Sequence, residues 1–154
     1  MINQKKIIRP PKEKNLHQHV CDYLNIQYPS VMFFSDASGM RVGMGLRNEL
    51  KRKRCKKWKI PDLHILEPRG PYAGLVIEVK RDRGEVYRKD GELVADETVQ
   101  AQAKALAHLR SVGYYADFGI GFDHCKEIID WYMKLGSKGV IPEDVVKKSY
   151  DKLG

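Results

Sequence analysis

The chain has 154 residues, of which 42% are hydrophobic and 31% are charged, and its formal net charge is +8. This length and composition fit one domain with a hydrophobic core, and no stretch approaches the roughly 20 apolar residues that would span a bilayer. The three cysteines and five histidines show no zinc-ligand or disulfide spacing, which excludes a zinc ribbon and a disulfide-rich fold. The basic balance favours a polyanionic partner, above all nucleic acid.

A basic arm and a helix come first in the chain. Residues 1–11 carry charge and prolines but no apolar signal core, so we expect an intracellular protein. Apolar residues at helical spacing predict a helix over residues 12–27, with His17 and His19 on its surface. Glu13 and His17 fall on the same stripe as the apolar residues. Glu13 is therefore either a first-turn acid stabilised by the helix dipole or a carboxylate turned toward a functional site.

A short buried strand is predicted over residues 31–34, followed by a loop of small residues over 35–45. That loop matches neither a dinucleotide-binding fingerprint nor a P-loop. Residues 46–58 are predicted to form a strongly basic helix.

Nine basic residues and a single acid lie between Arg41 and Lys59, and their difference equals the whole formal excess of +8. Such a run is either a solvated face or a surface that contacts phosphates. Its density, its Trp58 and its position directly before Pro61 favour contacts to a phosphate backbone, which would weaken steeply with salt. The nine are Arg41, Arg47, Lys51, Arg52, Lys53, Arg54, Lys56, Lys57 and Lys59.

Two strands are predicted next, over residues 62–66 and 73–80, joined by a turn as an antiparallel hairpin. Side chains alternate along a strand, so Glu78 and Lys80 point to one face and Val79 to the other. Because burying charge is costly, a carboxylate and an ammonium on an apolar strand must be paired or must bind a metal.

The hairpin would bring Asp62 toward Glu78 and Lys80. Two carboxylates suit a hard divalent cation, and Lys80 would lie where a phosphate or a metal-bound water reacts. This arrangement indicates a metal-dependent phosphodiester hydrolase. The short pattern by itself also fits an aspartate after a turn and an ion pair on a solvated face, so both interpretations stay open at this point.

The segment 81–96 is polar and is predicted to be an exposed loop or small hairpin facing DNA, with Arg81 and Arg83 as further phosphate contacts. A helix over residues 97–112 would place Gln102 on its apolar face. A buried amide needs partners, so Gln102 either bonds to backbone or points into the metal and phosphate site.

The remaining elements are a strand over residues 114–121, a helix over 123–135 and a terminal helix over 142–153, with Gly113 ending the preceding helix. No cysteine has a neighbouring base that would make it a nucleophile, so no covalent mechanism is indicated.

The order of elements and the spacing of the motifs resemble the VRR-NUC family of PD-(D/E)xK nucleases, including its small stand-alone phage and bacterial members. The resemblance covers residues 12–132. Residues 81–96 depart from it, because stand-alone members often run almost directly from E-x-K into the glutamine helix, and the tail after Gly136 lies outside the shared core. The motifs that carry the resemblance are Glu13, Pro61 and Asp62, Glu78 and Lys80, Gln102, and Gly113 with Tyr114.

The resemblance implies an α/β fold of the restriction-endonuclease-like type, with a mixed central sheet flanked by helices. It divides the chain into a basic arm over residues 1–11, a nuclease domain over 12–135 and a helical extension over 136–154. It also implies a site that holds Mg²⁺ or Mn²⁺ and cuts DNA phosphodiester bonds.

Residue roles are implied in the same way. Asp62 and Glu78 would be the metal carboxylates, and the backbone carbonyl of Val79 would be a further ligand. Glu13 would bind the metal directly or through water.

The other two matching residues would act on the attacking water. Lys80 would orient or deprotonate that water and offset charge at the phosphorane. Gln102 would position Lys80 or the water.

Stand-alone members resemble Holliday-junction resolvases, which act as two-fold dimers on a symmetric substrate. We therefore expect a structure-selective DNA endonuclease that is a homodimer, cuts branched DNA and acts in the cytoplasm of a phage host or bacterium. The alternatives are a flap or nicking nuclease of phage replication or packaging, a non-catalytic basic DNA-binding module, and a nuclease directed at RNA. No base-reading helix or RNA-recognition signature is present, which favours recognition of backbone and shape.

Overall fold

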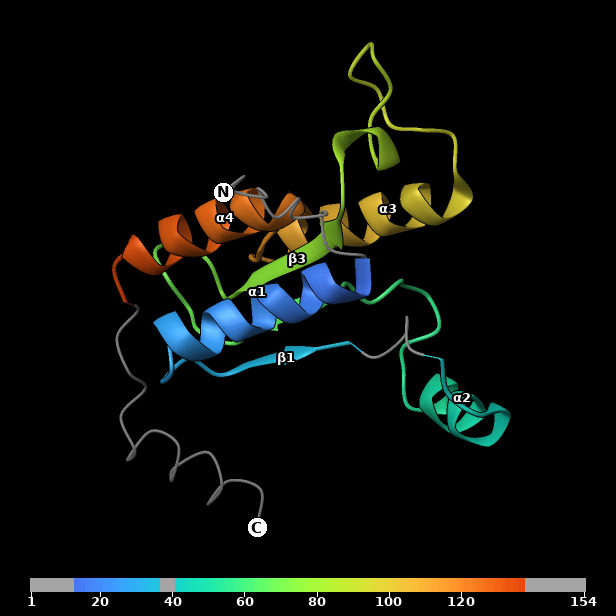
Figure 1. Cartoon of the computed structure of the whole chain (residues 1–154), viewed down its shortest axis with the longest axis horizontal. Coiled ribbons are helices and arrows are strands. Elements are labelled where there is room, and N and C mark those ends of the chain that lie inside the picture. Colours follow the sequence, from blue (N-terminus) through green and yellow to red (C-terminus); the bar gives the residue numbers. More distant parts are fainter. Residues whose placement is uncertain (1–12, 37–40, 138–154) are drawn as a thin grey trace, which may run out of the picture.

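The computed structural model describes residues 13–36 and 41–137 (Figure 1). The predicted basic arm and terminal helix lie outside the described residues, and the predicted domain bounds stay a prediction. No helix in the described part of the chain is both long enough and apolar enough to cross a membrane. The elements are, in chain order, α1 (Glu13–Gln27), β1 (Phe33–Ser35), α2 (Met44–Arg52), β2 (Leu63–Ile65), β3 (Leu75–Lys80), η1 (Arg83–Glu85), α3 (Glu97–Ser111), β4 (Tyr115–Ile120) and α4 (Gly121–Lys134).

The four strands form one mixed sheet in the order β1-β2-β3-β4. β2 pairs antiparallel with both β1 and β3, whereas β3 and β4 run parallel. The predicted hairpin and the predicted mixed sheet flanked by helices are therefore confirmed. Leu63 pairs with Ile77. Continuing this register by one residue places Asp62 opposite Glu78.

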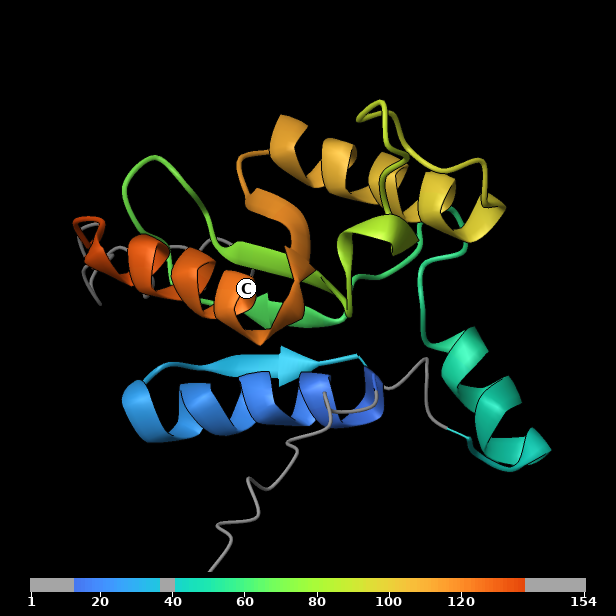
Figure 2. The same cartoon turned by 45° about the horizontal axis from the view of Figure 1, so that its top comes forward.

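Helices cover the two faces of the sheet unequally. α1 and α4 pack against each other and against β3, and α3 packs on β4 from the other side (Figure 2). Alternate residues of β3 enter two separate cores: Leu75, Ile77 and Val79 join α1 and α4, whereas Val76 joins the cluster under α3. Val79 thus points away from Glu78, as strand alternation predicts.

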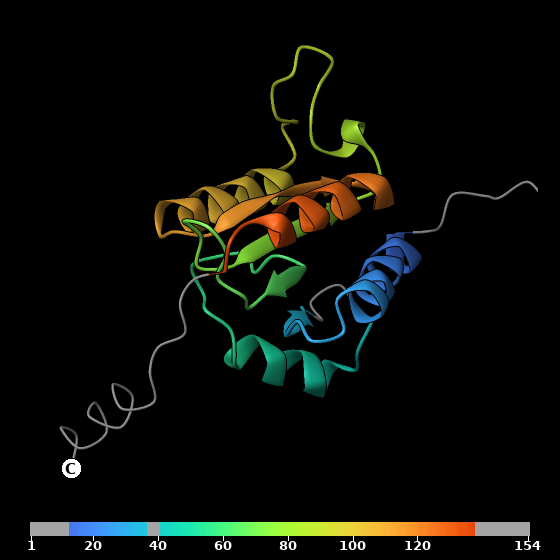
Figure 3. The same cartoon turned by 90° about the vertical axis from the view of Figure 1, so that its left-hand side faces the viewer.

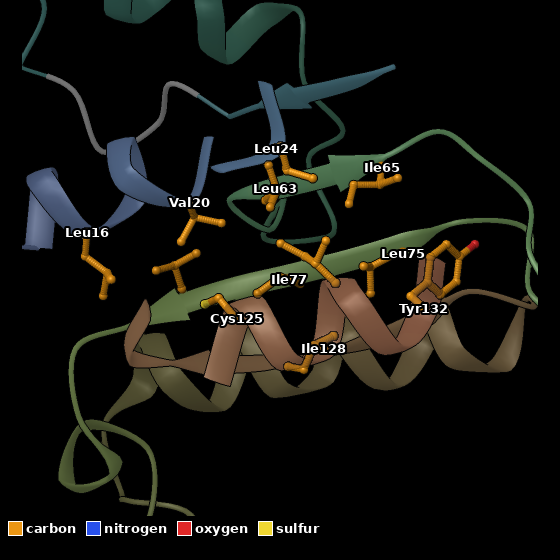
Figure 4. Packing of buried hydrophobic residues seen from close by; sticks show 12 residues of the cluster. Leu16, Val20, Leu24, Leu63, Ile65, Leu75, Ile77, Cys125, Ile128 and Tyr132 are labelled. Atoms are coloured by element: carbon orange, nitrogen blue, oxygen red, sulfur yellow. The ribbon is translucent and has the colours of Figure 1, made fainter. Parts of the chain in front are cut away.

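The larger core lies between β2, β3, α1 and α4 (Figure 4). Gly119 of β4 allows α4 to approach the sheet closely, since a Cβ there would lie 2.5 Å from the Cys125 Sγ and 2.6 Å from the Ile77 Cγ2. The predicted apolar stripe of the first helix is confirmed by its buried residues. They are Leu16, Val20 and Leu24.

The short strand predicted over residues 31–34 begins two residues later, at Phe33, and is not buried. Phe34 is 47% exposed and Ser35 is also exposed. The physical reason is the position of β1 at the edge of the sheet, where α3 does not cover it. A run of apolar residues indicated a strand correctly but did not indicate its place in the sheet.

The predicted basic helix over residues 46–58 is also shorter than expected. α2 ends at Arg52, and residues 53–58 form turns and bends. None of the α2 residues is buried, and the helix lies apart from the other helices (Figure 3). Without an apolar face to pack, and with like charges at neighbouring positions, nothing extends the helix further.

The segment 81–96 is only partly an exposed loop. It contains the short helix η1 and an isolated bridge between Tyr87 and Leu93, so the small-hairpin alternative describes it better. Val86 is completely buried in the core beneath α3. That apolar anchor holds the segment against the same helix that carries Gln102.

Candidate metal and nucleic-acid site

Two carboxylates face each other where β2 and β3 pair. Glu78 lies on a central strand and is only 4% exposed. Asp62 immediately precedes β2, and its Oδ2 accepts a hydrogen bond from the Val79 backbone N–H at 2.9 Å. The turn-forming Pro61 before it is buried. The hairpin thus fixes Asp62 against the neighbouring strand instead of leaving it in solvent.

Burial governs the ionisation of both acids. It raises the pKa of Glu78 to about 8, the Asp62 charge raises it further, and Lys80 acts in the opposite direction. Burial also raises the pKa of Asp62, although the Val79 hydrogen bond and the charges of His17 and Lys80 counteract it. Both carboxylates would be ionised together at neutral pH only if additional positive charge lay between them.

Lys80 supplies part of this charge. Its side chain is 9% exposed and lies on the same strand face as Glu78, two residues away. The charge of Lys80 lowers the pKa of both carboxylates, but burial outweighs it, and the pKa of Glu78 stays raised to about 8.

Gln102 of α3 contacts this group directly. Its Nε2 donates a hydrogen bond to Glu78 Oε1. Its Oε1 is buried and has no hydrogen-bond partner among the described residues. An orphaned buried acceptor next to two carboxylates leaves a position that a water or an ammonium donor would fill.

The donor set fits a hard divalent cation. Two carboxylates, a strand carbonyl and an amide oxygen are all oxygen donors, which Mg²⁺ and Mn²⁺ prefer. No cluster of three or more His, Cys, Asp or Glu side chains within metal-binding reach occurs in the described ranges. Glu13, the third predicted acid, begins α1, but its side chain lies outside the described part of the structure.

The predicted DNA-contacting residues are almost all exposed. Ten of the eleven side chains face solvent, including Arg81 and Arg83. Arg54 is the exception, because it is half-buried and forms an ion pair with Asp36 at 2.7 Å. This pair ties the basic segment to the residue that follows β1.

Two residues near the site make contacts that the sequence did not indicate. Trp58 stacks on His108 of α3, with ring centroids 4.3 Å apart and the planes at 6°. This stack fixes the segment that carries Lys59, whose charge is among those that oppose the burial-driven rise in the pKa of Glu78. Lys59 was predicted only as one of nine equivalent phosphate contacts. The neighbouring Trp58 was the only feature of the sequence that indicated a fixed position for this segment.

His17 is the other residue whose contacts the sequence did not indicate. It was expected on the helix surface, but it is half-buried and its Nε2 lies 3.1 Å from the Ser35 Oγ. Its charge is one of those that oppose the effect of burial on the pKa of Asp62. The sequence already indicated that His17 faces inward, because it lies on the same helical stripe as Glu13 and the apolar residues.

Two of the described cysteines, Cys21 and Cys125, are poor nucleophiles, in agreement with the sequence. Burial raises the pKa of Cys125 to about 12 and also raises the pKa of Cys21. Both therefore remain thiols at neutral pH. The chemistry of this site rests on oxygen donors and an ammonium.

No protein-family model matches the chain, and no curated protein matches it by sequence. A solved structure described as "VRR_NUC domain protein" is similar, with a TM-score of 0.58 and 23% sequence identity. The match covers 84% of this chain and 94% of that chain. The chain has the fold of a VRR-NUC domain protein. At this level of identity the likeness concerns the fold, and it confirms the resemblance that the motifs indicated.

Proposed function

We propose that this protein is a metal-dependent, structure-selective DNA endonuclease with a PD-(D/E)xK site. The observation that carries the proposal is Glu78, a buried carboxylate that lies opposite Asp62 and is bonded to Gln102. The fold of a VRR-NUC domain protein and the net charge of +8 support it. A buried acid pair of this kind is costly unless it has a cation to bind.

Asp62, Glu78 and the Val79 carbonyl would hold Mg²⁺ or Mn²⁺, with Glu13 bound directly or through water. A divalent cation held there lowers the pKa of its bound water and polarises a phosphoryl oxygen. The fixed hairpin register would keep the first two ligands in place before the substrate arrives, because Asp62 is already bonded to the Val79 N–H.

The remaining residues would act on the water and the phosphate. Lys80 would either orient the attacking water as an ammonium or take its proton as a neutral amine, and the resulting positive charge would offset the negative charge that develops as the P–O bond to the leaving strand breaks. Gln102 would keep Glu78 in place through its Nε2 and bind that water or Lys80 through its unpartnered Oε1. The exposed basic residues would bind backbone phosphates without selecting a base sequence.

The finer part of the proposal is activity like that of a Holliday-junction resolvase. A four-way junction presents two symmetric strands for cutting, so a two-fold homodimer would place one site at each. Recognition through phosphates and DNA shape is consistent with the exposed basic residues of the described surface.

The test incubates wild type and Glu78→Gln with labelled four-way junction, flap and linear duplex, each with Mg²⁺, Mn²⁺ or EDTA. Glu127→Gln, an exposed acid on α4, is the matched control. Paired symmetric cuts in the junction that need metal and vanish only in Glu78→Gln are expected. Cuts confined to flap or duplex would keep the nuclease and remove the resolvase. DNA binding without metal-dependent cleavage would leave a non-catalytic DNA-binding module.

A further inference from the structure

Part of the sheet face that carries the acids has no described helix packed over it. Strand alternation places Asp62, His64 and Leu66 on the face of Glu78, and pairing extends that face to Phe34 and Met32 of the edge strand. α3 covers this face over β4. Over β1 and β2 it is open, so that Met32 is 70%, Leu66 50% and Phe34 47% exposed.

Two aromatic rings are stacked in parallel on this open area. Phe34 and His64 lie opposite each other in the register, with ring centroids 4.5 Å apart and the planes at 6°. His64 is held by a hydrogen bond between its Nε2 and the Pro61 carbonyl at 2.9 Å. Phe34 has no other ring partner in the described structure.

The stack is close to the carboxylates. His64 is two residues from Asp62 on the same face, which corresponds to about 6.6 Å along the strand. Phe34 lies one strand further out, about 4.8 Å away. These spacings are comparable to two or three base steps of 3.4 Å along a DNA strand.

We infer that Phe34 and His64 form a stacking platform for an unpaired nucleobase close to the bond that is cut. Bases within a duplex already stack on each other, so only a flipped, flapped or single-stranded base has a free face for the Phe34 ring. This inference rests on the DNA-binding part of the proposed function. It assigns the substrate class as DNA with unpaired nucleotides next to the scissile phosphate.

The chemistry around the platform favours a nucleotide over an apolar protein surface. The Arg54–Asp36 pair begins beside the platform, because Asp36 lies two residues after Phe34, and it brings the basic segment to this strand. A nucleotide matches both features, since it combines a neutral aromatic face with a phosphate. An apolar partner would match only the exposed Met32, Phe34 and Leu66.

The experiment measures binding in EDTA, where no cut can occur, to a duplex and to the same duplex with a single-stranded flap. The first unpaired base of the flap is 2-aminopurine. Wild type should quench its fluorescence and bind the flap more tightly than the duplex. Phe34→Leu should weaken flap binding by roughly 5- to 100-fold and abolish the quenching, with duplex binding within about 2-fold of wild type. Phe34→Trp should retain both flap binding and quenching.

Ile26→Ala, an 80% exposed apolar residue on α1, is the control and should bind both DNAs like wild type. Thermal unfolding and sedimentation of each variant accompany the binding data. Equal losses for flap and duplex, no loss in Phe34→Leu, or dissociation of a dimer by that variant would each overturn the inference. The last outcome would assign the surface to a second protomer. Because cleavage plays no part, an inactive but flap-selective protein would support the platform while refuting the nuclease.

Discussion

The two faces of the central sheet serve different purposes, although neighbouring residues of one strand form them. On one face Leu75, Ile77 and Val79 pack with α1 and α4 into a continuous apolar core. On the other face the same strand presents Glu78 and Lys80, which are buried as well. Burial of side chains stabilises the fold on the first face and destabilises the fold on the second.

Magnitudes show why one face must compensate the other. Burying a large apolar side chain stabilises a fold by about 1.5–3 kcal/mol. A buried carboxylate instead costs free energy until it is protonated or paired, and the pKa of Glu78, raised to about 8 mainly by burial, expresses that cost. The separation of the faces therefore lets a small domain keep a destabilised site without losing its fold.

The largest expected effect is on catalysis, from Glu78→Gln. Losing one metal carboxylate should lower metal-dependent cleavage by at least about 10³-fold, because metal-ion stabilisation of the transition state amounts to several kcal/mol. Without metal the same variant should be more stable than wild type, since a neutral amide replaces a buried acid beside Asp62. Single-turnover cleavage and urea unfolding in EDTA measure the two changes. A variant that is inactive and also less stable than wild type would contradict the proposed free-energy cost of burying Glu78.

The neighbouring substitution Ile77→Ala should have the opposite profile. Ile77 is completely buried in the larger core, so a cavity there should lower the free energy of unfolding by about 2–5 kcal/mol. Well below the unfolding midpoint, Mn²⁺ affinity measured by calorimetry should change little. Ile26→Ala is the stability control, because exposed positions usually change stability by less than about 0.5 kcal/mol. A loss of metal affinity equal to that of Glu78→Gln would show that the faces are not separable.

Titration would sharpen the comparison at the level of one group. Glu78 has a folded pKa of about 8, raised by burial and by Asp62 from its ordinary value of 4.5. Between these pH values the folded protein holds a proton that the unfolded chain has released. The free energy of unfolding should therefore fall as pH rises through this window and become level above it.

The measurement is urea unfolding in EDTA at several pH values between 5 and 9, for wild type and Glu78→Gln. Other groups largely cancel in the difference, so the advantage of the variant should grow toward pH 8, by at least about 1 kcal/mol. Asp62, whose pKa is also raised by burial, shifts in the same direction. With Mn²⁺ present the dependence should reverse, because the cation binds the deprotonated acids. If the difference in the free energy of unfolding between Glu78→Gln and wild type did not vary with pH, the raised pKa of Glu78 would be refuted.

Much of this arrangement was accessible from the sequence because it depends on local spacing. Strand alternation placed Glu78 and Lys80 together and Val79 opposite them, and a short turn predicted the hairpin. The helical stripe of α1 predicted Leu16 and Val20 as core. The mixed sheet and its flanking helices were implied by the resemblance to the VRR-NUC family.

What the sequence did not indicate depends on contacts between distant elements. Periodicity cannot show that β1 is an edge strand, so Phe34 was predicted to be buried. Nor can it show that Trp58 meets His108, which lies 50 positions away in the chain. Gln102 was left with two alternatives, and only the tertiary structure brings its amide to Glu78. Its role in catalysis stays a prediction.

The smallest expected effect separates two lysines of the basic segment. Lys56 and Lys59 are both exposed, but Lys59 follows the Trp58 ring that stacks on α3, and its charge lowers the pKa of Glu78. Lys59→Ala should slow single-turnover cleavage by about 3- to 10-fold, because its charge acts on one of the acids that would hold the metal. Lys56→Ala should weaken DNA binding by about 2-fold and lower its salt dependence, while leaving the rate at saturating protein unchanged.

Rates at saturating protein decide between these roles, since they do not depend on affinity. Equal effects of the two substitutions on binding, with no effect of either on the rate, would make Lys59 an ordinary phosphate contact. A rate effect confined to Lys59→Ala would instead extend the functional face beyond the strands. In that case the Trp58 and His108 stack would be part of the site, because it holds a highly charged segment where the charge is needed.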